Sequence, residues 1–123
     1  MLRHVAITIN REMDLETFYK EILGFNEMRR FTLPVDLSDK LFGISEATEV
    51  VLLKSGDIYL EAFLSNRKID PVYGHICISL QNRIDAMQKA ELNGYSVTRI
   101  ERTAKEDLVF IRDGTGNSFE LVE

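Results

Sequence analysis

Residues 4–9 read His-Val-Ala-Ile-Thr-Ile, and residues 75–80 read His-Ile-Cys-Ile-Ser-Leu. Both stretches follow one pattern: histidine, apolar, small, apolar, hydroxyl, apolar. Alternation with a period of two residues is typical of a strand whose two faces differ. The histidine, the small residue and the hydroxyl residue then share one face, and the large aliphatic side chains share the other. The repetition predicts that the chain contains two copies of one structural unit.

A helical segment follows each of these strands. Residues 14–23 carry apolar side chains at helical spacing, and Asp14 is the expected N-cap. The second helix is expected at about residues 84–92, with Asn82 as its cap. Both segments run into a similar tripeptide with glycine in the middle, Leu23-Gly24-Phe25 and Asn93-Gly94-Tyr95, as helix ends commonly do.

Three strand-like runs follow each helix. They are expected at residues 27–33, 48–54 and 58–64 in the first copy, and at 96–102, 107–112 and 117–122 in the second. Each unit is therefore βαβββ, and the predicted fold class is α+β with two such modules. We expect a single domain, 1–123, with modules at 1–66 and 74–123 and a linker at 67–73.

The first copy carries extra sequence at residues 34–45, which explains why His4 and Glu61 are 57 residues apart whereas His75 and Glu120 are 45 apart. This insertion reads as a surface loop with a short helical turn at 39–42. Its apolar residues, Leu37, Leu41 and Phe42, fit either of two roles. The insertion covers a cavity as a lid, or it forms a contact in a dimer.

Each unit has one histidine on its first strand and one glutamate on its last, namely His4 and Glu61, then His75 and Glu120. Taken alone, a strand histidine is usually a hydrogen-bonded structural residue, and a glutamate near a strand end is usually solvated. Here the chain's only two histidines occupy matching positions of the repeat. Two imidazoles and two carboxylates suit a divalent ion of Ni, Co, Zn, Mn or Fe. The pattern therefore predicts a metal site.

Over its whole length the chain resembles the vicinal-oxygen-chelate superfamily, which includes glyoxalases, bleomycin-resistance proteins and dioxygenases. The resemblance rests on the opening His4 strand, the helix end at 18–25, Gly74-His75 and the closing stretch at 113–121. It implies paired half-barrels that cup a metal and, as in many short members, a homodimer with the site at the interface. The ligand order His, Glu, His, Glu resembles bacterial glyoxalase I (lactoylglutathione lyase). It implies Glu61 or Glu120 as the catalytic base.

The function implied is that of a metal-dependent lyase or isomerase, acting on a 2-oxo compound or its thiol adduct through a metal-stabilised enediolate. The metal acts as a Lewis acid on two neighbouring oxygens, and a carboxylate moves the carbon-bound proton. One alternative is a dimeric binding protein of the bleomycin-resistance type, which sequesters a small molecule without turnover. Another is a dioxygenase-like enzyme, in which Glu61 would be surplus.

Three positions depart from the glyoxalase I pattern. Thr8 and Pro71 stand where arginines contact glutathione in that family, and Ser65 stands where an asparagine is usual. These departures argue against glutathione as the thiol.

Strand alternation predicts the cavity lining. Thr8, Tyr59, Phe63, Cys77 and Ser79 are expected on the same face as the ligands, where they would bind the substrate. For Tyr59 and Phe63, a partly buried core position is the alternative. Cys77 is expected to be a small buried filler and not a nucleophile. The strand arginines fit a substrate carboxylate or phosphate, or equally a solvated edge; they are Arg29, Arg30, Arg99 and Arg102.

Composition limits the remaining classes. The net charge of −5 argues against nucleic acid as a partner. No apolar run reaches the roughly 18 residues that span a bilayer, and no leader segment is visible. The single cysteine excludes an internal disulfide and favours a reducing compartment. We therefore expect a cytoplasmic protein whose partners are a small-molecule substrate and a second copy of itself.

Overall fold

The computed structural model describes residues 2–67 and 74–123. The first half of the chain forms β1 (Val5–Ile9), η1 (Leu15–Ile22), β2 (Asn26–Leu33), α1 (Val35–Phe42), β3 (Thr48–Ser55) and β4 (Ile58–Leu64). The second half forms β5 (Ile76–Ser79), α2 (Arg83–Leu92), β6 (Ser96–Ile100), β7 (Leu108–Arg112) and β8 (Ser118–Val122). This order confirms the predicted α+β fold of two βαβββ modules.

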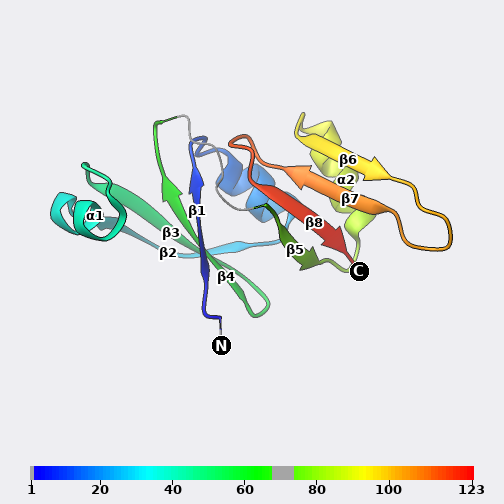
Figure 1. The fold of residues 1–123 in the computed structure, drawn as a ribbon, viewed down its shortest axis with the longest axis horizontal. Helices are drawn as coiled ribbons and strands as arrows, with labels where there is room; N and C mark the ends of the chain where they lie inside the picture. The colour runs from blue at the N-terminus through cyan, green and yellow to red at the C-terminus, as the bar shows by residue number, and fades with distance from the viewer. Residues whose placement is uncertain (1, 68–73) are drawn as a thin grey trace.

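Each module makes one four-stranded sheet, with the strand orders β1-β4-β3-β2 and β5-β8-β7-β6. In each sheet the first and last strands are parallel neighbours, and the other pairings are antiparallel. Figure 1 shows the two sheets side by side, with α1 at the outer end of the first sheet. The parallel pairing places the first strand, which a histidine directly precedes, beside the last strand, which carries a glutamate.

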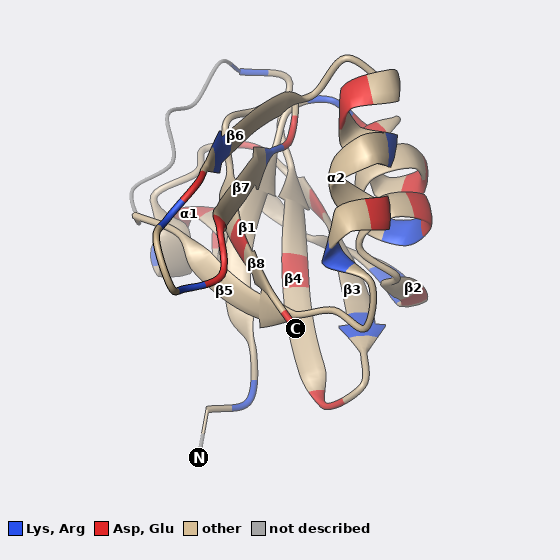
Figure 2. Ribbon diagram, turned by 90° about the vertical axis from the view of Figure 1, so that its right-hand side faces the viewer, with Lys and Arg blue, Asp and Glu red and all other residues tan. Residues whose placement is uncertain are grey.

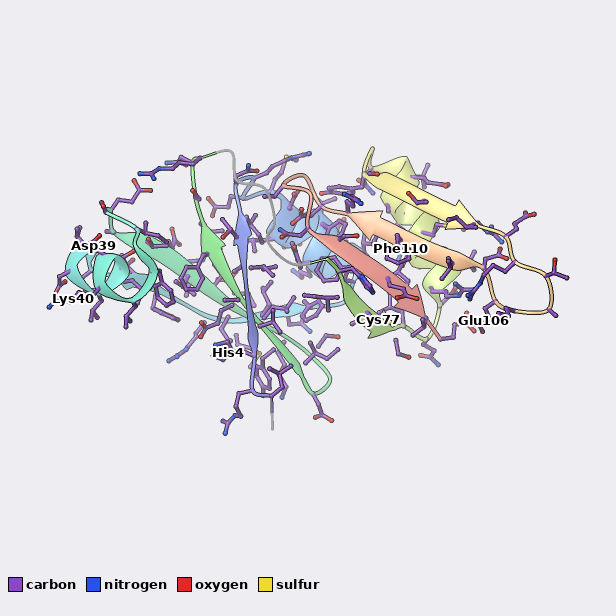
Figure 3. All side chains as sticks on the ribbon, in the orientation of Figure 1. His4, Asp39, Lys40, Cys77, Glu106 and Phe110 are labelled. Carbon is purple, nitrogen blue, oxygen red and sulfur yellow. The ribbon has the colours of Figure 1, made fainter. Side chains whose placement is uncertain are left out.

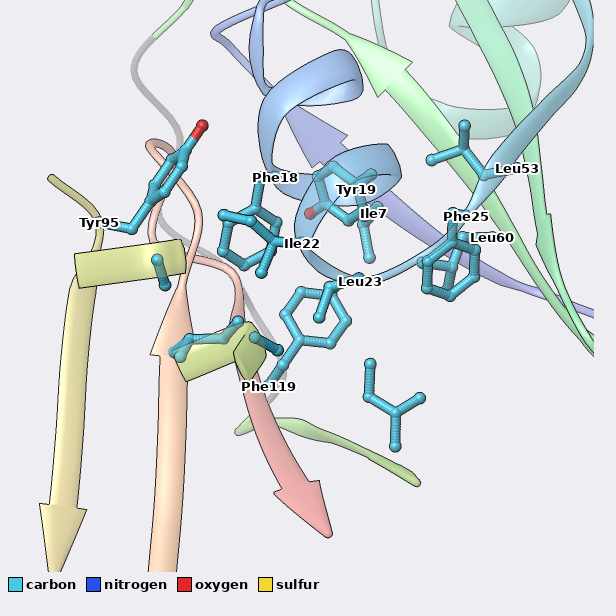
Figure 4. Close-up of a cluster of buried hydrophobic side chains, with 14 of the residues drawn as sticks. Ile7, Phe18, Tyr19, Ile22, Leu23, Phe25, Leu53, Leu60, Tyr95 and Phe119 are labelled. Atoms are coloured by element: carbon cyan, nitrogen blue, oxygen red, sulfur yellow. The ribbon is translucent and has the colours of Figure 1, made fainter. Parts of the chain in front are cut away.

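One hydrophobic core joins the two modules. The helices η1 and α2 contact each other and cover one face of the sheets. Phe18 lies at the centre, with its ring 5.1 Å from Tyr19, 4.9 Å from Tyr95 and 5.8 Å from Phe119, between ring centroids. These rings come from both halves of the chain and are all buried (Figure 4). Tilted and edge-to-face aromatic contacts add to the burial of apolar area, so the two modules pack as one body.

The opposite face of each sheet is not covered by η1 or α2. In β1 the core residues are Ile7 and Ile9, and Ala6 is exposed. We call this second side the open face of a sheet. It is the face on which the sequence places the histidines and glutamates.

The helix boundaries follow the predictions, but one cap was assigned wrongly. Asn82 caps α2 as expected, its side-chain oxygen accepting a hydrogen bond from the backbone N–H of Asp85 at 3.1 Å. Asp14 precedes η1, yet its side chain makes no capping hydrogen bond. Its carboxylate instead accepts the hydroxyl of Tyr95 at 2.8 Å and the backbone N–H of Gly114 at 2.7 Å. A contact between the modules has replaced the local cap.

The turn at residues 113–117 makes further contacts between the second module and the first. The carboxylate of Asp113 accepts the hydroxyl of Tyr19 at 2.7 Å and several backbone N–H groups of its own turn. Burial raises the pKa of Asp113 in spite of these bonds. Asn117 donates to the backbone oxygen of Thr8 at 2.8 Å. Gly114 approaches Asp14 so closely that a Cβ would lie 2.8 Å from its carboxylate oxygen. The turn therefore fastens the second module to the end of β1.

The insertion is more helical than predicted. α1 spans Val35–Phe42, whereas the sequence indicated only a turn at residues 39–42. It begins after Pro34 and ends at Gly43, which is in the left-handed conformation (φ 67°). The hydroxyl groups of Ser38 and Thr48 share a buried hydrogen bond of 2.8 Å, which ties α1 to β3. Of the predicted linker at 67–73, only Arg67 is described, and Pro71 lies outside the described residues.

Within the part of the chain that the structure describes, no helix is long and apolar enough to cross a membrane. Figure 2 shows that α2 contains both acidic and basic residues.

Replacing Asp14 with alanine should strongly destabilise the fold. The change leaves the buried hydroxyl of Tyr95 and the N–H of Gly114 without their acceptor, at a cost of about 2–4 kcal/mol in the free energy of unfolding. Urea denaturation measures this loss. Glu16→Ala is the matched control on the same helix, because Glu16 makes only an exposed ion pair with Lys20 and its loss should cost less than about 0.5 kcal/mol. Equal stabilities of the two variants would contradict the junction.

Candidate metal and substrate site

His4 and Glu61 meet on the open face of the first sheet. β1 and β4 are parallel, with Ala6 opposite Glu61, and His4 lies two residues before Ala6 on the same side. The Nε2 atom of His4 is 3.4 Å from a carboxylate oxygen of Glu61. The side chains are 45% and 21% exposed, so both remain open to solvent and to a ligand.

His75 and Glu120 repeat this arrangement on the second sheet. Cys77 lies opposite Glu120 in the parallel pair of β5 and β8. The Nε2 atom of His75 is 3.1 Å from a carboxylate oxygen of Glu120, and the side chains are 44% and 23% exposed. The nearly equal geometry of the two pairs follows from the equal topology of the two modules.

Phe110 supports the second pair, a role that we did not predict from the sequence. It lies opposite Glu120 on β7, and its ring contacts the ring of His75 edge to face at 5.2 Å. Alternation along β7 carries the signal, because Val109 and Ile111 are buried in the core and Phe110 must therefore project from the open face.

The pairs fit the requirements of a metal ligand set. Nitrogen and oxygen donors about 2.1 Å from one ion, at a right angle to each other, are about 3.0 Å apart. The measured separations of 3.4 Å and 3.1 Å are close to that spacing. A small adjustment of each pair would therefore suffice to hold one divalent ion.

One chain does not bring the two pairs together. Within residues 2–67 and 74–123, no three side chains of histidine, cysteine, aspartate or glutamate gather closely enough to hold a metal ion. Figure 3 shows His4 on the first sheet and Cys77, the neighbour of Glu120, on the second. Each chain thus carries two separate pairs of one imidazole and one carboxylate, and we call each pair a half-site.

The predicted substrate residues are divided between the same two faces. Thr8 lies opposite Phe63, on the same side of the first sheet as Glu61, and Tyr59 is also on this side. Cys77 and Ser79 are exposed on the second sheet. Phe63 is only 7% exposed and packs against Phe42 of α1, with ring centroids 5.0 Å apart. Its position therefore combines packing under α1 with a place on the open face.

The prediction that Cys77 is buried was wrong. The residue is exposed on β5 beside Glu120, because it occupies the open-face position that matches Ala6 in the first module. Partial desolvation of the thiol, followed by the charge and hydrogen bonding of Glu120, raises its pKa. A raised pKa lowers the thiolate fraction at neutral pH, in keeping with the expectation that Cys77 is not a nucleophile.

Two hollows flank the first pair. The larger, of about 500 Å³, contains His4 and Glu61 and is also lined by Arg3, Arg29, Leu52 and Tyr59. A smaller one of about 60 Å³ is lined by Ile44 in the segment after α1 and includes Thr8, Phe63 and Ser65. Two of the positions that depart from the glyoxalase I pattern thus line a hollow that is distinct from the one around His4 and Glu61.

The four arginines singled out in the sequence have different surroundings. Arg30 pairs with Glu12, Glu27 and Glu49 at 2.8–2.9 Å. Arg99 pairs with Asp107 at 2.8 Å, which lowers the pKa of that aspartate, and Arg102 donates to the backbone oxygen of Glu106. Arg29 lines the larger hollow, and its guanidinium lies 5.0 Å from the ring centroid of Phe31.

Comparison with solved structures identifies the fold. The glyoxalase family protein from Enterococcus faecalis has a TM-score of 0.72 and 23% identity, with 100% of this chain and 97% of that chain covered. A genomically encoded fosfomycin resistance protein from Listeria monocytogenes, solved with Mn(II) and dihydroxypropylphosphonic acid, has a TM-score of 0.72 and 13% identity, covering 98% of this chain and 87% of that chain. The chain has the paired βαβββ fold of glyoxalase-family proteins.

Sequence comparison finds similarity to a named enzyme, lactoylglutathione lyase. The chain is 27% identical over 126 residues to lactoylglutathione lyase of Escherichia coli O157:H7, with 99% of this chain and 91% of the lyase covered. The lyase of Shigella flexneri gives the same values. No protein-family model matches the chain. Together with the fold, these relatives confirm the resemblance to the vicinal-oxygen-chelate superfamily.

The environment of Cys77 makes a prediction for thiol chemistry. In metal-free protein, Glu120→Gln should speed alkylation of Cys77 by iodoacetamide at pH 7.5, because loss of the carboxylate charge lowers the thiol pKa and increases the thiolate fraction. Mass spectrometry of the modified chain measures the rate. Glu16→Gln, which changes an exposed carboxylate on η1, should leave the rate at its wild-type value. An unchanged rate in Glu120→Gln would show that Glu120 does not control this thiol.

Proposed function

We propose that the protein is a metal-dependent lyase or isomerase of the glyoxalase kind, acting on a 2-oxo compound or its thiol adduct. The observation that carries this proposal is the pair of matched half-sites. Each half-site has an imidazole nitrogen and a carboxylate oxygen 3.1–3.4 Å apart, on an open and solvent-accessible face. The similarity to lactoylglutathione lyase favours this chemistry over others hosted by the same fold.

The complete site requires a second copy of the chain. One chain holds its half-sites on separate sheets, so His4 and Glu61 of one copy would face His75 and Glu120 of the other. A two-fold arrangement makes two such sites in a dimer, because each copy contributes one half-site of each kind. The four donors, His4, Glu61, His75 and Glu120, would hold one divalent ion per site with its charge balanced by the two carboxylates.

The chain's own residues divide the chemistry. A divalent ion held by these donors supplies Lewis-acid polarisation of two neighbouring substrate oxygens. Glu61 or Glu120 would take the proton from the carbon that bears the substrate hydroxyl and return it to the neighbouring carbonyl carbon, so that the hydroxyl carbon becomes the new carbonyl; this is general-base and then general-acid action. Tyr59 and Leu52, beside Glu61, offer an apolar wall that orients the substrate and excludes water. Phe110 restrains the ring of His75 in the second half-site.

The thiol partner is proposed to differ from glutathione. The first half-site lacks the arginine that the glyoxalase I pattern has at position 8, and Thr8 and Ser65 line a hollow of only about 60 Å³. A smaller thiol, or a 2-oxo substrate without one, fits this surface better. Sequestration without turnover and a dioxygenase-like reaction are the alternatives. Tight ligand binding without product would favour the first, and oxygen uptake with ferrous ion the second.

The shared site is tested by mixing inactive variants. His4→Ala and His75→Ala should each lose the metal ion. After subunit exchange at equal concentrations, about half of the dimers are mixed, and each mixed dimer regains one intact site of two, so the metal content should recover to about a quarter of wild type. Mass spectrometry of metals per chain measures the recovery.

The control for this experiment mixes His4→Ala with Glu61→Ala. Both variants damage the same half-site, so every site in a mixed dimer still lacks a ligand and no metal should return. Recovery in both mixtures would contradict a site shared between copies. A wild-type protein that binds none of Ni, Co, Zn or Mn would remove the metal-dependent proposal altogether.

The role of the carboxylates is tested by turnover. Glu61→Gln and Glu120→Gln, assayed with hemithioacetals of methylglyoxal, should identify the base as the variant that loses about 10²–10⁴-fold in kcat. The other variant should lose less, in proportion to its weaker metal binding. Glu49→Gln, away from the half-sites, is the matched control. Equal and small losses in both variants would rule out proton transfer by these residues.

A further inference from the structure

We propose that Arg29, assisted by Arg3, forms a subsite for an anionic group of the substrate, a carboxylate or another oxyanion, beside His4 and Glu61. The proposal deepens the proposed function and rests on it only in taking this hollow as the substrate's place. It assigns a specificity-determining role to one strand arginine out of the four that the sequence singles out.

A β-bulge directs Arg29 to the open face. In the antiparallel pair of β2 and β3, Glu27 lies opposite Leu53 and Arg29 lies opposite Leu52, so Met28 is an extra residue without a partner. Without this insertion, Met28 would face Leu52 and Arg29 would point to the helix side. Bulges commonly re-aim a side chain next to a functional site. Here the bulge places a cation where regular alternation would place an apolar residue.

The same bulge places the two adjacent arginines, Arg29 and Arg30, on different faces of the sheet, with different partners. Arg30 lies opposite Val51, which is a core residue, so its side chain is on the helix side of the sheet. There it is held by three carboxylates, which raise its pKa still further and accept hydrogen bonds from four of its five N–H donors. Arg29 makes no salt bridge with any carboxylate of the described residues. Its guanidinium instead rests near the ring of Phe31, on its own face, at 5.0 Å.

Register brings Arg29 into line with the half-site. Ala6, Glu61, Leu52 and Arg29 lie opposite one another across β1, β4, β3 and β2, and so form one row on the open face. With strands about 4.8 Å apart, Arg29 starts about 10 Å from Glu61. A substrate held at the half-site would reach the guanidinium across Leu52, which is the span of a few carbon atoms.

The charge of the hollow fits an anion. Of its six lining residues, Arg3 and Arg29 are cationic and Glu61 is the one carboxylate. Lys54 lies close by on the same face, its ammonium 5.2 Å from the ring centroid of Tyr59. The whole chain has a net charge of −5, so a cationic hollow runs against the general charge of the protein. Guanidinium groups bind carboxylates through paired hydrogen bonds, which gives both affinity and orientation.

The second sheet lacks this feature. Its matching row is Cys77, Glu120, Phe110 and Thr98, so threonine stands where the first sheet has Arg29. The two half-sites are alike in their histidine and glutamate but differ at the far end of the row. The cation is therefore not needed for the repeated fold, and a ligand-binding role accounts for it.

Binding of two dyes to the metal-free protein tests the subsite without turnover. 8-Anilinonaphthalene-1-sulfonate carries an anionic group, and N-phenyl-1-naphthylamine has the same rings without it. Arg29→Gln should weaken binding of the sulfonate about five- to tenfold and leave the neutral dye unchanged. Arg99→Gln, which removes an arginine from the second sheet, should change neither. Fluorescence titration at low and high salt measures the dissociation constant of each dye.

Three results would overturn the proposal: no binding of the sulfonate dye to the wild type, equal constants in wild type and Arg29→Gln, or equal weakening of both dyes. Circular dichroism checks that the variant is folded, and Arg29→Lys, which keeps the charge, should recover part of the binding.

Turnover of a thiol series then identifies the anion. Hemithioacetals of methylglyoxal with 3-mercaptopropionate, 2-mercaptoethanesulfonate and 2-mercaptoethanol carry a carboxylate, a sulfonate and no charge. Arg29→Gln should lower kcat/KM about tenfold for the preferred anion and leave the neutral adduct unchanged. Equal kcat/KM for all three adducts in the wild type would contradict an anionic substrate. If no adduct is turned over, the proposed reaction fails, and the dye titration still decides the subsite.

Discussion

The parallel pairing of the first and last strands in each module is the constraint on which the rest of the structure depends. Parallel neighbours cannot be joined by a tight turn and need a long crossover, which in this chain contains a helix and two further strands. The crossover helices η1 and α2 then cover one face of the sheets and leave the other open. Because side chains alternate, a slip of one residue in this pairing would send His4 and Glu61 to opposite faces. The half-site and the core therefore depend on the same register.

The junction between the modules fixes the two half-sites on separate sheets. Phe18, Tyr95 and Phe119 unite the helices and the second sheet, and the bonds of Asp14 and Asp113 lock the turn at 113–117 to the end of β1. This packing uses the covered faces. The open faces are left for ligands or for another chain. A chain joined in this way packs as a unit yet holds its two half-sites apart, so in the proposed dimer the assembly of two chains and the formation of the site would be one event.

Much of this arrangement could be predicted from the sequence because the repeat and the alternation are local properties. The period of two residues places His4 and Ile7 on different faces of the strand. The repeat extends this argument to His75. Contacts between distant segments were not accessible in the same way. In the sequence Asp14 looks like an ordinary helix cap. Only the folded chain shows that its carboxylate accepts hydrogen bonds from Tyr95 and Gly114. Strand alternation alone did not settle the burial of Cys77, because its burial depends on what covers β5.

The bulge in β2 shows the limit of pattern reading most clearly. Arg29 and Arg30 are neighbours of one type in a strand of exposed residues, and alternation alone assigns them to opposite faces without saying which faces the half-site. One extra residue, Met28, decides the matter through the register with β3. The duplicated scaffold keeps histidine and glutamate at equal positions in both sheets, whereas the far ends of the two rows differ as Arg29 and Thr98. A duplicated fold can thus repeat the geometry of a histidine–glutamate pair while an irregularity in one strand changes the charge beside only one of the two pairs.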